Sequence, residues 1–238
     1  MENWHYTDLL KAHKFFIEVE GRFKFYDAYM KAREPNAWLK YPKDVPLKEG
    51  LLLFGWVLSW EPEFMGDLAQ FYENHGQLFH EVKGFENETI VTINFTESVK
   101  KSIFHIFNKL GLYTIRRKER FESTGTSKIL HVIIPELFVM WDTAIRKGIL
   151  GPKNEYKGSE YAYEFLPKMQ NFAKQFLDTY VRENGGDYEY ASKQISQIAE
   201  GYTLAKLLDE LNFLRFTKGK TLAEIRSISL SVLGGNNT

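Results

Sequence analysis

The chain has 238 residues, of which 44% are hydrophobic, 26% charged and 16% aromatic, and its 31 basic residues balance its 31 acidic ones. These values are typical of a globular protein with a sizeable core, and a net charge of zero argues against nucleic-acid binding through a general basic excess. Cysteine is absent, which excludes disulfides, thiol nucleophiles and zinc sites with cysteine ligands.

The first residues of the chain have neither the basic nor the apolar region of a signal peptide. The apolar run of residues 51–60 is too short to span a bilayer, which takes about 20 residues. We therefore expect a cytoplasmic protein without a membrane segment.

Hydrophobic residues recur every three or four positions along most of the chain, a spacing that predicts helices. The predicted helical segments are residues 7–33 (one helix or a pair), 51–59, 63–82, 96–110, 128–134, 142–147, 159–184, 189–200, 203–216 and 221–233. Their predicted N-caps include Thr7, Thr126 or Ser127, Asp142 and Thr203. Three prolines predict a loop over residues 35–48, and the alternation over 88–95 could form a strand but has no partner.

The predicted fold is therefore all-α, a compact domain of about nine helices. Within it, residues 1–111 and 112–233 could form two lobes, and residues 234–238 form a flexible tail.

The stretch of residues 124–146 combines a long apolar run with three polar exceptions, Lys128, His131 and Asp142. Lys128 and His131 share one helical face, and Asp142 could approach Lys128 if residues 137–141 fold back. A lysine in apolar surroundings loses its proton more readily and can then attack an aldehydic carbon. The alternative is structural: Asp142 caps a helix, Lys128 reaches solvent, and His131 is a hydrogen-bonded core residue.

A basic cluster precedes this stretch. Its members, together with neighbours that could join them in a phosphate-binding surface, are Arg116, Arg117, Lys118, Arg120, Gly125, Lys128, Arg146 and Lys147. Alternatively the cluster is a solvated loop in which Glu119 and Glu122 pair with the basic side chains.

No other segment indicates a reactive site. His75 and His80 lie five positions apart, on different helical faces, so we expect no metal site there. Lys206 can pair with Asp209 or Glu210 along one helix. No phosphate-binding loop, dinucleotide fingerprint or nucleophile elbow is present, and no cofactor is expected.

The segment of residues 139–146, Val-Met-Trp-Asp-Thr-Ala-Ile-Arg, resembles the segment that holds the catalytic aspartate in the helix-hairpin-helix DNA glycosylases. The resemblance implies an all-helical fold with a cleft for a flipped base, Asp142 as the catalytic aspartate, and Lys128 as the lysine of the bifunctional members. His131 and Trp141 would then belong to the pocket. Only one glycine of that family's hairpin is matched, Gly125, and the spacing from lysine to aspartate is shorter. The stretch also resembles helical proteins of prokaryotes with no assigned activity.

The sequence therefore leads to two alternative hypotheses about function. The first is a nucleic-acid-binding protein with DNA as its partner, similar to a DNA glycosylase/lyase of DNA repair. The second is a non-catalytic helical protein that acts through a protein partner or as a homo-oligomer, for which the aromatic content could supply an interface. The sequence leaves open whether the chain is an enzyme.

Overall fold

The computed structural model describes residues 3–41, 45–60, 76, 79–113, 121–153 and 157–230, without the side chains of 112 and 113. All regular structure in these ranges is helical, which confirms the predicted all-α class. The α-helices are α1 (Tyr6–Val19), α2 (Phe23–Ala32), α3 (Ala37–Lys40), α4 (Leu47–Trp60), α6 (Glu97–Tyr113), α7 (Ser123–Ile133), α8 (Thr143–Leu150), α9 (Leu166–Asn184), α10 (Tyr188–Ile198), α11 (Leu204–Asn212) and α12 (Leu222–Arg226). Three short helical segments join them: η1 (Lys83–Phe85), η2 (Glu160–Phe165) and η3 (Phe213–Thr217).

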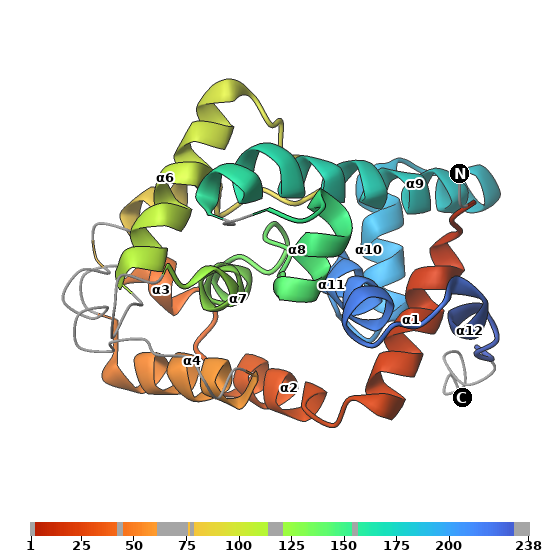
Figure 1. The fold of residues 1–238 in the computed structure, drawn as a ribbon, viewed down its shortest axis with the longest axis horizontal. Coiled ribbons are helices and arrows are strands. Elements are labelled where there is room, and N and C mark those ends of the chain that lie inside the picture. Colours follow the sequence, from red (N-terminus) through yellow and green to blue (C-terminus); the bar gives the residue numbers. More distant parts are fainter. Residues whose placement is uncertain are drawn as a thin grey trace.

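The helices surround a centre made of α7, α8 and α11 (Figure 1). Helix α1 packs against α11 and also contacts α9, α10 and α12, so the first helix lies among the last ones. Helices α2 and α4 pack on each other along the lower edge of the view in Figure 1, on the side away from α9. Helix α4 also contacts α7. The helices therefore do not group by the two halves of the chain, although one contiguous hydrophobic cluster runs through the described residues.

The fold has more helices than the nine expected, for local reasons. Residues 20–22 separate α1 from α2, and the proline-rich segment predicted to be a loop contains the one-turn helix α3. Residues 88–95 form turns, in which the Thr89 hydroxyl accepts from the amides of Val91 and Thr92. Residues 61–75, most of the predicted helix 63–82, lie outside the described residues, as does the predicted tail.

Two predicted caps differ from the observed ones. Helix α1 begins after His5, whose ring accepts from the Thr7 amide while Asp8 completes a capping box. Helix α7 begins at Ser123, earlier than predicted, because the Glu122 carboxylate accepts from the Gly125 amide. Glu122 is thus the N-cap of this helix, in place of the predicted Thr126 or Ser127.

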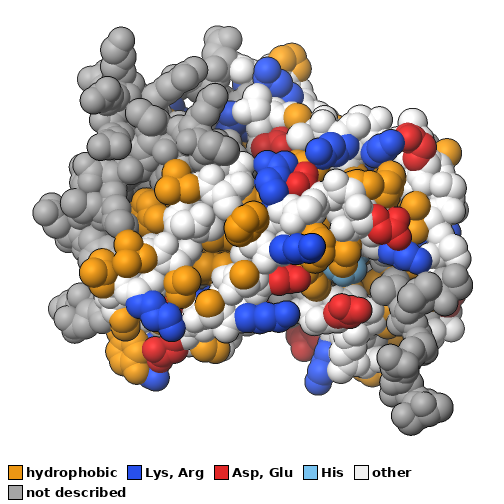
Figure 2. All heavy atoms as spheres, turned by 90° about the horizontal axis from the view of Figure 1, so that it is seen from below, with side chains coloured by type: hydrophobic (Ala, Val, Ile, Leu, Met, Phe, Trp, Pro, Cys, Tyr) orange, Lys and Arg blue, Asp and Glu red, His pale blue; other side chains and the backbone are white. Residues whose placement is uncertain are grey.

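Helix α4 was predicted to be buried on all sides, which is wrong. Leu47, Leu51 and Leu58 are 61%, 56% and 44% exposed and lie on one side of this helix. Seen from the side of α2 and α4, hydrophobic side chains gather over part of the surface, and charges of both signs are mixed over the rest (Figure 2). Phe25 of α2 is also exposed. In the part of the chain that the structure describes, no helix combines the length and hydropathy needed to cross a membrane.

Candidate active site

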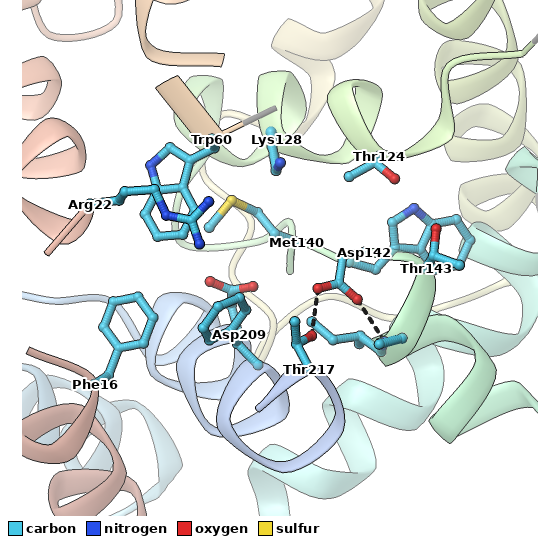
Figure 3. Close-up of a pocket in the computed structure, with 14 residues that line it drawn as sticks. Phe16, Arg22, Trp60, Thr124, Lys128, Met140, Asp142, Thr143, Asp209 and Thr217 are labelled. Carbon is cyan, nitrogen blue, oxygen red and sulfur yellow. Dashed lines mark hydrogen bonds between the residues drawn. The ribbon is translucent and has the colours of Figure 1, made fainter. Parts of the chain in front are cut away.

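A pocket of about 600 Å³ opens between α7, the start of α8 and the carboxy-terminal part of α11 (Figure 3). Its wall combines four aromatic side chains and four charged ones with threonine and aliphatic residues. The lining residues are Phe16, Arg22, Trp60, Thr124, Lys128, Met140, Trp141, Asp142, Thr143, Ala144, Ile145, Asp209, Phe213 and Thr217. Lys128 and Asp142, the two predicted catalytic residues, thus line the same pocket.

The fold-back that brings these two residues together is fixed by their neighbours in the chain. After α7 ends, the buried residues 137–141 run back along the helix without regular structure. The Trp141 amide donates to the Ser127 hydroxyl at 3.2 Å, and the Trp141 indole donates to the Ser123 carbonyl at 3.1 Å. Tyr161 donates to the Val139 carbonyl at 2.8 Å and holds the same link from its other side. Because Ser127 precedes Lys128 and Trp141 precedes Asp142, these bonds set both residues on one cavity.

Asp142 is the N-cap of α8, as predicted, and its Oδ1 accepts from the Ile145 amide at 2.8 Å. Its Oδ2 accepts from the Thr217 hydroxyl at 2.5 Å. The positive end of the helix dipole stabilises a negative charge at this position. The carboxylate is therefore held in a fixed orientation while it lines the pocket (Figure 3).

Lys128 lies in the buried helix α7, and only 9% of the residue is exposed. Its side chain points into the pocket from the wall opposite Asp142 (Figure 3). The structural alternative placed Lys128 in solvent, and this part of the alternative is wrong. Asp142 both caps α8 and lines the pocket, so the capping role does not exclude a catalytic role for this residue.

Aromatic rings surround the polar groups. Trp141 is 1% exposed and packs against Phe107, Tyr161 and Phe165 with ring centroids 4.9 to 5.8 Å away. At the other end of the pocket, the Phe16 and Trp60 rings are parallel with centroids 6.2 Å apart. Such walls exclude water and offer faces on which a planar ring can pack.

His131 does not line the pocket, contrary to its predicted place there. The fully buried ring bonds the Phe138 carbonyl through Nδ1 at 2.6 Å and the Tyr26 hydroxyl through Nε2 at 3.1 Å. Burial lowers the pKa of His131 to about 3, and the nearby Lys206 charge acts in the same direction. The ring is therefore neutral, with Nδ1–H as donor and Nε2 as acceptor, and belongs to the core.

The predicted phosphate-binding residues are only partly described. Arg116, Arg117, Lys118 and Arg120 lie outside the described residues. Gly125 lies in the buried first turn of α7, where its amide already donates to Glu122. Arg146 donates to the Thr143 hydroxyl at 2.9 Å and lies 5.9 Å from the Trp141 ring, and Lys147 is exposed on α8. Of the described members of this set, Lys147 is exposed and Arg146 is half-buried.

A buried charged cluster lies behind the pocket, on α11. The Lys206 amine is 2.8 Å from Asp209 and 3.4 Å from Glu210, and Glu210 also pairs with His13 at 2.7 Å. Burial opposes the charge of Lys206, but attraction to both carboxylates outweighs it and raises the pKa of this lysine. The predicted pairs along the helix are thus present, yet they are buried and one member, Asp209, lines the pocket.

Of the residues that line the pocket, the sequence analysis placed only Lys128, Trp141 and Asp142 there, and the lining residues that it missed include Arg22, Asp209 and Thr217. Arg22 donates to Glu20 at 2.7 and 2.9 Å and lowers the pKa of Glu20 to about 2. Each of these side chains fits an ordinary surface or capping position in its own segment, so only the packing of α1 against α11 and of η3 against α8 reveals it. In the described residues, no group of three or more histidine or acidic side chains could hold a metal ion.

No protein-family model, no curated protein and no solved structure matches this chain.

Proposed function

We propose that the chain is a nucleic-acid-binding protein of the DNA glycosylase/lyase type, with the pocket as the site for a base turned out of the helix. One observation carries the proposal: Lys128 and Asp142 lie on opposite walls of one ring-lined cavity. Its volume of about 600 Å³ is within the range of small-molecule sites. Enzymes that act on a base hold it in a pocket, between apolar side chains.

The roles follow from the positions. When the glycosidic bond breaks, its electron pair leaves with the base, and positive charge develops on the sugar. The oriented carboxylate of Asp142 stabilises that charge, with Thr217 and the α8 amide keeping it in place. Water adds at C1′ and loses a proton, which gives the abasic sugar. The Lys128 amine then attacks C1′ of its open, aldehydic form, and loss of water gives an imine. Lys147, which is exposed on α8, would contact a flanking phosphate.

Borohydride trapping tests this function directly. Hydride reduces the imine to a stable amine, so protein incubated with a duplex that contains an abasic site should become covalently linked to DNA. Lys128→Ala should abolish the adduct, and Lys193→Ala, the same change on an exposed lysine of α10, should leave it unchanged. Absence of any adduct, together with no salt-dependent binding of the duplex, would refute the proposal.

A second candidate, a non-catalytic interaction role, is favoured by the exposed leucines of α4. Monomeric proteins seldom expose a contiguous apolar stripe without a use for it. Analytical ultracentrifugation of the wild type and of Leu51→Lys, at a leucine that is 56% exposed, tests for self-association through this face.

A further inference from the structure

The end of the pocket around Asp209 has features that the catalytic pair does not use. Asp209 projects from α11, and its carboxylate points towards the middle of the pocket (Figure 3). Its Oδ2 accepts from Lys206 at 2.8 Å. Its Oδ1 has no hydrogen-bond partner among the described residues, although the side chain is only 11% exposed. A carboxylate held in this way presents acceptor capacity to whatever occupies the cavity.

The elements behind Asp209 hold it in place. Burial raises the pKa of its carboxyl group, and the charge of the bonded Lys206 amine opposes that rise. The Lys206 amine lies 4.8 Å from the Phe16 ring centroid and 5.1 Å from that of Tyr26. These rings leave the amine little freedom, and Glu210 attracts it from the next turn of the same helix. Asp209 therefore does not need to move to meet a ligand, which reduces the entropic cost of binding.

The same end of the pocket is aromatic. Phe213 meets the Phe16 and Trp60 rings edge-on, with centroids 5.6 and 6.3 Å away. Phe16, Trp60 and Asp209 lie on one side of the pocket, and Asp142 lies nearer the start of α8 (Figure 3). A planar heterocycle could thus pack on the rings while its edge meets the carboxylate.

We infer that Asp209 is a specificity-determining residue that accepts hydrogen bonds from the edge of a base with two adjacent N–H donors, as in guanine. The two oxygens of a carboxylate match two parallel N–H groups, and charge-assisted bonds of this kind are the strong ones. Adenine has an unprotonated ring nitrogen beside its amino group, so that nitrogen would face the carboxylate and be disfavoured. This inference rests on the proposed function, because it names the class of base that the same pocket takes.

Free nucleosides test it without any chemical step. We would measure binding of 2′-deoxyguanosine, 2′-deoxyinosine, purine 2′-deoxyriboside and 2′-deoxyadenosine to the full chain by calorimetry. The first three differ in having two, one and no donors on the relevant edge. We expect affinity to fall about tenfold with each donor lost, with 2′-deoxyadenosine no better than the purine deoxyriboside.

Two variants complete the test. Asp209→Asn keeps the shape of the side chain and leaves Lys206 paired with Glu210. In this variant the affinities of successive nucleosides should differ by well below tenfold. Asp178→Asn, the same change on an exposed residue of α9, should retain the full series. Equal binding of the first three nucleosides by the wild type, or no binding at all, would overturn the inference whether or not Asp209→Asn folds.

The two proposals fail separately. A borohydride adduct at Lys128 without discrimination between nucleosides would remove the role of Asp209 alone. Graded nucleoside binding without an adduct would retain the base-recognition end and remove the lyase chemistry.

Discussion

Thr217 donates a 2.5 Å hydrogen bond to Oδ2 of Asp142 and joins η3, near the end of the described chain, to the first turn of α8. Asp142 thereby accepts at both oxygens, since its Oδ1 already caps the helix. Thr217 is thus a positioning residue for the carboxylate.

Thr217→Val removes this donor but keeps the shape of the side chain. We expect the rate of borohydride trapping to fall about tenfold, because a hydrogen bond to a charged group contributes roughly 1.5–3 kcal/mol. Thr217→Ser restores the hydroxyl and should restore the rate. A rate for Thr217→Val equal to that of the wild type would show that the cap by Ile145 suffices to orient Asp142.

Lys206→Met should destabilise the protein strongly. The change leaves Asp209 and Glu210 buried without their shared cation, and breaking a buried ion pair from one side costs about 3–5 kcal/mol. Urea unfolding measures this loss. The matched control is Lys220→Met, which removes a more exposed partner of Glu224 and should cost much less stability. Equal losses for the two variants would contradict the described burial of the cluster.

Stability should depend on pH through His131. Its pKa is lowered from 6.5 to about 3 in the folded protein, so between these values the unfolded chain binds a proton that the folded chain does not. The free energy of unfolding therefore falls as the pH falls below 6.5, by about 1.4 kcal/mol per pH unit from this residue. His131→Gln should be less stable at neutral pH, yet should lose less stability between pH 6 and 5 than the wild type. Parallel pH profiles of the two proteins would contradict a neutral, buried ring.

Gly148→Ala should disturb the pocket from a distance. A Cβ at Gly148 in α8 would lie 2.2 Å from the Phe216 ring of η3, so the ring must move, and with it the neighbours that line the pocket. We expect a loss of about 1–3 kcal/mol in unfolding free energy and a lower trapping yield. Gly55→Ala in α4 meets nothing within 4 Å and should be neutral, or stabilising by up to about 1 kcal/mol. A Gly148→Ala variant as stable and active as Gly55→Ala would show that Phe216 can turn away freely.

The sequence predicted the features that depend on local spacing. The all-α class, the cap at Asp142 and the cap at Thr203 follow from periodicity and from the hydrogen bonds of short polar side chains. Lys128 and Asp142 can line one pocket only if the link of residues 137–141 folds back. The sequence allowed this arrangement, and the hydrogen bonds between Ser127 and Trp141 fix it in the structure.

What the sequence could not predict depends on packing between distant segments. Lys206, Asp209 and Glu210 have the spacing of ordinary pairs on a helix surface, and the cover provided by α1, together with Tyr26 of α2, makes them a buried cluster. The cap at Glu122 was missed because a glutamate is an uncommon N-cap, so α7 was predicted to begin at Lys128. The basic cluster of residues 116–120 stays a prediction.

The position of α1 has a consequence for biosynthesis. Phe16 comes from the first helix and Thr217 from the last part of the described chain, yet both line one cavity. A nascent chain emerging from the ribosome can form α2, α4 and α7 early, but the helices that contact α1 most among the described residues, α9 to α12, are made last. The cavity is thus completed late, after most of translation, and much of the apolar side of α1 stays uncovered until then, when it is most open to chaperones.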